Sequence, residues 1–383
     1  MARETDVRHP FRSVYLQPKL PQNQMIIFDI YPNSKSAIAA LRTHTLRMQR
    51  SILHLLRCLP ATFDFGASSL DDIEMKISSS AGLPVEVHYL HNVLIHAMRQ
   101  GDLDTSRIIA RKLVHVLDGA PISHKLQIES IGTDSWEGQA ICRATQVARK
   151  ETGLDAIAEP LTEQEELSHR GHIENALNIL YLHQPEMHTE IISLVRSIKL
   201  FSGKITQGLT DTTVFGEIYI RTPRPCLSPD LYYVEHIVHE ASHTYLNCLM
   251  AADPIVLNDK AATFASPLRS DPRPMYGVFH ATFVASRMAL SFREIYDKTC
   301  DERYIKLLAE VTDEAIRGLE TIEHHASLTP MGRQLTSSMI ELTDRIIQLS
   351  QLRKFDFDRK QPHRCGAGEA RFLRLKELVN AVN

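Results

Sequence analysis

Apolar residues recur at three- and four-residue spacing along most of this chain, and this helical period restricts the possible folds more than any other feature. The run at 36–59 is typical, and it stops at Pro60, which cannot continue a helix. Pro185 interrupts a later run in the same way. Equivalent patterns predict helices at 85–99, 103–117, 135–150, 163–182, 186–199, 232–250, 276–298, 301–325, 330–352 and 369–382.

One stretch, Thr206–Thr222, has the composition of β-structure instead. Within it, Phe215–Ile220 is dominated by β-branched and aromatic residues, which favour strands. This pattern predicts a hairpin or a pair of edge strands. The expected fold class is therefore mainly α, with a small β-sheet or hairpin beside the helix predicted at 232–250.

That helix contains His239-Glu240-Ala241-Ser242-His243, an HExxH motif. Two histidines four residues apart lie on one face of a helix, so both imidazoles can reach one metal ion. The carboxylate of Glu240 can address a metal-bound water or a neighbouring ligand. A surface helix with two hydrogen-bonded histidines is the alternative interpretation.

A catalytic metal site commonly has three protein ligands, and His280 is the best candidate for the third. It lies 37 positions after His243 (280 − 243), in the first turns of the next predicted helix. Its neighbours Gly277 and Ala281 are small enough for that helix to approach the motif helix closely. The weaker candidates are a glutamate deeper in the same helix, two loop aspartates and two histidines at a helix end: Glu294, Asp253, Asp259, His324 and His325.

Two arginines lie in the proline-rich loop between the motif helix and the helix of His280. Beside a metal, Arg269 or Arg273 could bind a carboxylate through two parallel hydrogen bonds. Prolines on both sides of Arg273 restrict the backbone there. A surface arginine in a solvated loop is the alternative for either residue.

The motif divides the expected domain organisation into three parts. Residues 1–200 form a helical N-terminal region that serves as a scaffold or binds peptide. Residues 201–353 form the catalytic region with the HExxH metal site. Residues 354–383 form a basic linker and a C-terminal helix.

Bulk properties exclude several classes of function. The net charge of −3 gives no reason to expect nucleic acid or an anionic membrane as a partner. No apolar run is long enough to cross a bilayer, and the N-terminus lacks the apolar core of a secretory signal. The six cysteines form no CxxC pair, which favours reduced thiols in the cytoplasm. The oligomeric state is open.

Several motifs together resemble one family. Val238–His243 is followed by Ser266-Pro267-Leu268-Arg269, then by Arg273-Pro274-x-x-Gly277-Val278-x-His280, and later by Leu328-Thr329-Pro330-x-Gly332-Arg333. This pattern resembles the HEXXH-motif family of peptide-modification proteins, which occurs with ribosomally synthesised, post-translationally modified peptides (RiPPs). The similarity is strongest over about residues 205–290 and weaker out to about 350.

The resemblance implies an Fe(II)- and 2-oxoglutarate-dependent oxygenase, a dioxygenase that hydroxylates the β-carbon of a side chain in a precursor peptide. It implies that His239, His243 and His280 hold the iron and that Arg273 or Arg269 holds the far carboxylate of 2-oxoglutarate. Such a site departs from the two-histidine, one-carboxylate arrangement usual for non-haem iron oxygenases. The departure leaves open whether Glu240 is a ligand or an orienting group.

Two other functions remain open at this point. The same residues could form a Zn(II)-dependent metallopeptidase, with Glu240 as the general base and the strand at Phe215–Ile220 aligning an extended peptide. The third possibility is a non-catalytic helical binding protein. Imidazole ligands alone do not select among zinc, iron, copper and nickel.

Overall fold

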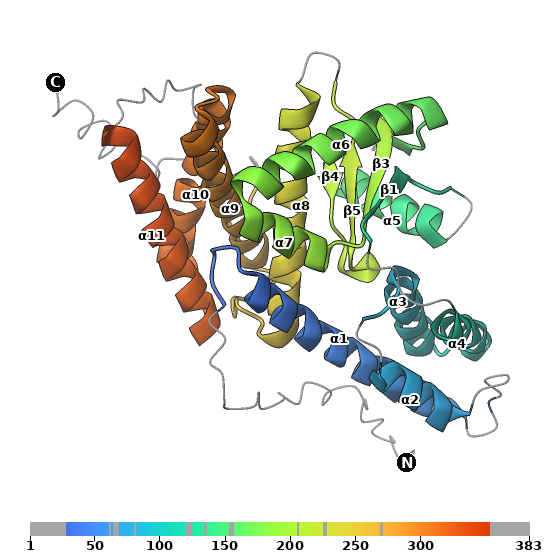
Figure 1. Ribbon diagram of the computed structural model, residues 1–383. Helices are drawn as coiled ribbons and strands as arrows, with labels where there is room; N and C mark the ends of the chain where they lie inside the picture. The colour runs from blue at the N-terminus through green and yellow to red at the C-terminus, as the bar shows by residue number, and fades with distance from the viewer. Residues whose placement is uncertain are drawn as a thin grey trace.

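The computed structural model describes residues 28–352, apart from 61–62, 64–68, 80–81, 120–124, 134–135, 153–156, 205–206, 225–227 and 269–270. Figure 1 shows helices arranged around one small sheet. In the described residues the helices are α1 (Ser34–Arg57), α2 (Leu70–Ser79), α3 (Val85–Gln100), α4 (Leu103–Asp118), α5 (Trp136–Thr152), α6 (Glu163–His183), α7 (Pro185–Leu194), α8 (Pro229–Ala252), α9 (Met275–Thr299), α10 (Arg303–His325) and α11 (Pro330–Leu352). The fold is mainly α with a small sheet, as predicted.

Local chemistry explains several helix boundaries. Thr162 and Glu165 form a capping box at the start of α6, each side chain binding the other residue's backbone N–H. Prolines occupy the first position of α7 and α8, where no intrahelical N–H bond is lost. None of the described helices combines the length and apolar character needed to span a bilayer.

The sheet has a parallel centre. Its strands are β1 (Gln127–Ser130), β2 (Ile157–Glu159), β3 (Ser197–Lys204), β4 (Gly208–Leu209) and β5 (Glu217–Arg221). The order is β1-β3-β5-β4, in which β1, β3 and β5 run parallel and β4 runs antiparallel to β5. Strand β2 pairs antiparallel with the far end of β3. In Figure 1, α6 crosses in front of this sheet.

The two faces of the sheet contact different cores. Ile198, Leu200, Ile218 and Ile220 point into the larger core, which also contains the buried faces of α6–α11. The alternate residues Phe201 and Tyr219 point into a smaller core with α3 and α4. This alternation follows from the two-residue side-chain period of a strand.

The prediction for 186–199 was partly wrong, because α7 ends at Leu194 and β3 begins at Ser197. Strand pairing with β1 on one side and β5 on the other stabilises the extended form, and this non-local pairing overrides the local helical pattern. Helix α2 was not predicted, since the stretch 61–83 had no clear period. The predicted β-structure near 206–222 is present as β4 and β5, but β5 lies inside the sheet.

The predicted division of the chain stays a prediction. The boundary predicted between residues 200 and 201 falls inside β3. Helices α1, α6 and α7 precede this boundary, and they pack in one core with α8 and α9, which follow it. Two further strands, β6 (Thr263–Phe264) and β7 (Arg273–Pro274), pair in the proline-rich loop. The expected linker and helix at 354–383 lie outside the described residues.

A completely buried arginine connects three helices of the larger core. The guanidinium of Arg287 on α9 forms an ion pair with Glu190 on α7, and it donates to the Ile30 carbonyl at 3.0 Å. It also donates through Nε to the Ser242 hydroxyl on α8 at 3.1 Å. The guanidinium lies 4.9 Å from the centre of the Tyr245 ring.

We predict that Arg287→Met lowers the free energy of unfolding by about 3–5 kcal/mol, because it leaves the Glu190 carboxylate buried without its cation. Urea denaturation measures this change. Arg317→Met is the control, since the Arg317–Asp313 pair is exposed and should contribute at most about 1 kcal/mol. Equal effects of the two substitutions would contradict the assignment.

Three buried histidines lie in the N-terminal half. His44 on α1 stacks on Phe215 with ring centres 3.9 Å apart, and His88 on α3 stacks on His44 at 5.5 Å. The His91 ring nitrogen lies 2.8 Å from the Ser51 hydroxyl. Burial lowers the pKa of His44 and of His91 to about 4, and it lowers the pKa of His88 well below its usual value.

These histidines predict a loss of stability in acid. Their pKa values are lower in the folded chain than the ordinary 6.5, so the unfolded chain binds more protons between about pH 6.5 and 4. Stability is therefore complete above pH 6.5 and falls as the pH drops, by up to about 1.4 kcal/mol per pH unit for each histidine. His44→Phe should reduce this slope, as measured by urea denaturation across the pH range. Parallel curves for the variant and the parent would contradict the prediction.

Candidate functional site

The HExxH motif lies in the middle of α8, which is surrounded by the larger core on most sides. This position fixes the backbone of the motif rather than leaving it on a surface helix. The rings of His239 and His243 are one helical turn apart, with centres at 5.0 Å. The His239 side chain is 31% exposed, whereas His280 is 8% exposed, so the site reaches solvent on the His239 side.

Helix α9 places His280 directly beside His243. The two Nδ1 atoms are 3.3 Å apart, and the rings stack with centres at 5.5 Å. Tyr276 lies one turn earlier on α9, with its ring centre 4.3 Å from that of His280. The other ring nitrogen of His280 lies 3.0 Å from the Met250 sulfur on α8. The predicted meeting of these two helices at His243 and His280 is therefore present.

Burial keeps these imidazoles neutral. It lowers the pKa of His243 to about 3 and that of His280 to about 4, and for His243 the neighbouring His280 lowers it further. The pKa of His239 is also lowered well below its usual value, first by burial and then by His243. Neutral imidazole is the form that binds a metal ion.

The donor chemistry and one of the spacings fit a metal ion. Two nitrogens bound to one tetrahedral ion at about 2.0–2.1 Å are separated by roughly 3.4 Å, which is close to the separation of the two Nδ1 atoms of His243 and His280. A complete arrangement is not formed, because no group of three or more His, Cys, Asp or Glu side chains in the described residues is placed to hold an ion. The role of the three histidines as ligands stays a prediction.

The Glu240 carboxyl lies between His239 and the sheet, with its Oε1 4.0 Å from His239 Nε2. Thr210, directly after β4, donates its hydroxyl to Glu240 Oε2 at 2.6 Å. A Cβ atom placed on Gly208 would lie 2.1 Å from Glu240 Oε1, so β4 covers this carboxyl group closely. Burial raises the pKa of Glu240 to about 8, and the Thr210 hydrogen bond partly opposes this rise.

The arginines of the loop are only partly described. Arg273 forms β7 together with Pro274, and its Nε lies 2.9 Å from Asp271 Oδ2. Arg273 lies two residues before the start of α9 and seven positions before His280 (280 − 273). Arg269 lies outside the described residues. The proposed carboxylate-binding role of either arginine stays a prediction.

The weaker ligand candidates have structural partners. Asp253 and Asp259 accept hydrogen bonds from backbone N–H groups two residues ahead, which is typical of turns. Glu294 accepts a hydrogen bond from Gln184 at 3.0 Å. His324 and His325 lie in the last turn of α10, where a positive charge is favourable.

The loop after α8 contains an unusual backbone position. Ile255 is buried and has a φ of 62°, a left-handed conformation that β-branched residues rarely adopt. Its carbonyl accepts the Thr329 N–H at 3.0 Å, just before α11. A Cβ atom on Gly332 would lie 2.5 Å from this carbonyl oxygen. The close approach explains the glycine in the Leu328-Thr329-Pro330-x-Gly332-Arg333 segment.

Several residues of the site were not predicted from the sequence. Thr210 and Gly208 reach Glu240 only because β4 crosses α8, and no local pattern encodes that crossing. Met250 lies two helical turns after His243, so helical spacing could have indicated it. Tyr276 lies four residues before His280, so helical spacing could have indicated it as well.

Comparison with known proteins adds no assignment. No family model matches this chain. No curated protein matches it either.

We predict that Gly208→Ala destabilises the fold by about 1–3 kcal/mol, because the new methyl group and the Glu240 carboxyl cannot occupy the same space. Glu240→Ala removes that carboxyl, so Gly208→Ala should cost less in the double variant. A double-mutant cycle by urea denaturation measures this coupling. Gly171→Ala is the control, since its Cβ meets nothing within 4 Å. Additive effects at 208 and 240 would contradict the contact.

Proposed function

We propose that this protein is a peptide hydroxylase that uses Fe(II) and 2-oxoglutarate to oxidise a side-chain β-carbon in a ribosomally made precursor peptide. The observation that carries the proposal is the pairing of His243 with His280 across α8 and α9, one turn from His239. The sequence resemblance supplies the substrate class and the cofactor. The cytoplasm is the compartment expected for such a precursor.

His239, His243 and His280 would hold the metal, with the His239 ring turning to join the other two. When bound, an Fe(II) centre with 2-oxoglutarate supplies an oxidant for a C–H bond, converting 2-oxoglutarate and O₂ to succinate and CO₂ with one oxygen atom left in the peptide hydroxyl. Arg273, at the entrance to α9, is the described candidate for binding the far carboxylate of 2-oxoglutarate. Substrate would approach on the exposed His239 side.

The position of Glu240 favours this proposal over hydrolysis. A hydrolytic general base must contact the attacking water. Glu240 is only 3% exposed, and although its Oε1 lies 4.0 Å from His239 Nε2, its carboxyl accepts the Thr210 hydroxyl and is covered by β4. In this arrangement Glu240 is a positioning residue that connects α8 to the sheet.

A zinc metallopeptidase is the second candidate. The observation that favours it is β4, an edge strand in the described sheet that lies against the HExxH helix. An extended peptide could add to such an edge through main-chain hydrogen bonds. Glu240 would then have to exchange Thr210 for water.

The decisive test incubates purified protein anaerobically with Fe(II), 2-oxoglutarate and candidate peptides before oxygen is admitted. We expect the peptide mass to rise by one oxygen atom, with succinate formed in equal amount. Peptide cleavage with Zn(II) and without 2-oxoglutarate would support the metallopeptidase instead. Absence of both reactions, with no metal retained, would support a non-catalytic binding protein.

Metal content gives a readout that does not depend on the peptide. His243→Ala and His280→Ala should each lower bound Fe(II) per chain by about tenfold or more at limiting metal, because each removes a ligand. His324→Ala is the matched control, since it removes a histidine at the end of α10. Unchanged metal binding in both site variants would contradict the proposed ligand set.

A further inference from the structure

A cavity lies on the other face of the sheet from the HExxH motif. It has a volume of about 310 Å³ and is lined by the first residues of β1, β3 and β5 together with the starts of α3 and α5. Ile218 and Ile220 point toward the larger core that contains the motif, whereas Glu217 lines this cavity. The two sites are therefore separated by the sheet itself.

The strand residues facing this cavity are polar, although the covered faces of parallel sheets are usually apolar. Parallel pairing places Gln127, Ser197 and Glu217 side by side in one row. The same register places Glu129 and Lys199 in the next row, beside Tyr219. A polar face at an expected core position indicates a functional constraint.

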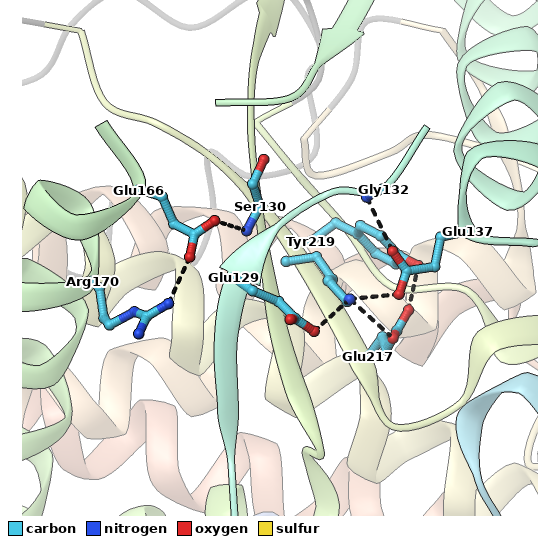
Figure 2. A network of polar contacts seen from close by, with 9 residues as sticks. Glu129, Ser130, Gly132, Glu137, Glu166, Arg170, Glu217 and Tyr219 are labelled. Carbon is cyan, nitrogen blue, oxygen red and sulfur yellow. Dashed lines mark hydrogen bonds and ion pairs between the residues drawn. The ribbon is translucent and has the colours of Figure 1, made fainter. Parts of the chain in front are cut away.

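One ammonium group in this cavity contacts three carboxylates. Lys199 donates to Glu129 Oε1 at 2.7 Å and to Glu137 Oε1 at 2.5 Å, and its Nζ lies 3.9 Å from Glu217 Oε1. Figure 2 shows Glu129, Glu137 and Glu217 converging from separate elements. Burial raises the pKa of Glu217 to about 7, so near neutral pH the net charge of this cluster lies between −1 and −2. Glu129 is partly exposed whereas Glu137 and Glu217 are largely buried, and an excess of negative charge in such a site favours the entry of a cation.

Two further polar side chains of the cavity could bind a ligand. The Ser197 hydroxyl is only 3% exposed and interacts with Glu217, which lowers the pKa of that carboxyl, and it has no other hydrogen-bond partner in the described residues. Arg196 is half-buried at the same wall, and no carboxylate in the described part of the chain lies within ion-pair distance of it. Burial lowers the pKa of Arg196, as expected for a guanidinium without such a partner.

The cavity is also lined by Trp136, the only tryptophan of the chain, by the apolar residues Leu83, Pro84 and Val85, and by the charged residues Glu86 and Lys125. An indole beside carboxylates is suited to an organic cation on an apolar stem. The outer edge of β1 is closed to an added strand at Ser130, because Glu166 accepts the Ser130 N–H at 2.9 Å and is held by Arg170 (Figure 2). The cavity volume of about 310 Å³ suits a compact ligand.

We propose that this cavity binds a basic amino acid, either free or as the C-terminal residue of a peptide. Its side-chain ammonium or guanidinium contacts the Glu129–Glu137–Glu217 cluster and the Ser197 hydroxyl, its stem packs on Trp136, and its carboxylate pairs with Arg196. The volume suits a ligand of this size. The inference does not rest on the proposed hydroxylase activity.

Isothermal titration of the full-length protein tests this assignment with L-lysine, L-arginine, cadaverine and norleucine. We expect a basic amino acid to bind, cadaverine to bind more weakly for want of a carboxylate, and norleucine to bind at least about tenfold more weakly for want of the side-chain cation. Peptides ending in lysine, with free or amidated C-termini, distinguish a peptide ligand from a free amino acid.

Variants locate the binding. Glu217→Gln and Trp136→Leu should each weaken binding by about tenfold, and Arg196→Gln should abolish the preference for lysine over cadaverine. Glu159→Gln, an exposed carboxylate on β2 of the same sheet, is the control. Thermal unfolding of each variant verifies folding, and Trp136→Leu carries the test if Glu217→Gln is unfolded.

Two results would overturn the proposal. One is the failure of both basic amino acids and both peptides to bind the parent protein at millimolar concentration. The other is binding that is unchanged in Glu217→Gln and Trp136→Leu. Neither result bears on the HExxH site, because the metal-content measurements use residues on the opposite face of the sheet.

Discussion

The contact of α8 with α9 is the constraint on which the rest of this structure depends. This contact brings His243 and His280 together. Arg287 of α9 stabilises it, because its guanidinium donates a hydrogen bond to Ser242 inside the motif. A buried guanidinium has a high desolvation cost unless all its partners are in place. The ion pair with Glu190 therefore makes the orientation of the motif helix dependent on α7 as well.

The sheet gives this helical protein two chemically different surfaces. One face is aliphatic and forms part of the core behind the histidines. The other begins with Gln127, Ser197 and Glu217, continues with Glu129 and Lys199, and becomes apolar at Tyr219 and Phe201. Because neighbouring strand residues alternate between faces, both surfaces are encoded in the same few residues of β3 and β5. A change of register by one residue would exchange them.

Sequence reasoning succeeded where the information is local. The helical period predicted most of the helices, and helical spacing placed His239 and His243 on one face. It failed at β3, whose extended form depends on β1 and β5, partners that are distant in sequence. The hydrogen bond between Thr210 and Glu240 likewise could not be predicted from the sequence, because it exists only where β4 crosses α8. The polar cavity around Lys199 was missed because its carboxylates come from three separate elements.

The left-handed residue after α8 has a consequence for sequence variation. Ile255 is held in a conformation that costs of order 1–3 kcal/mol, and its carbonyl lies in the space that a side chain at 332 would occupy. Among relatives of this chain, positions 255 and 332 should therefore vary together. A larger residue at 332 would be accompanied by a shortened or re-routed loop. The start of α11 would then lose the Thr329 hydrogen bond that now connects it to the loop after the motif helix.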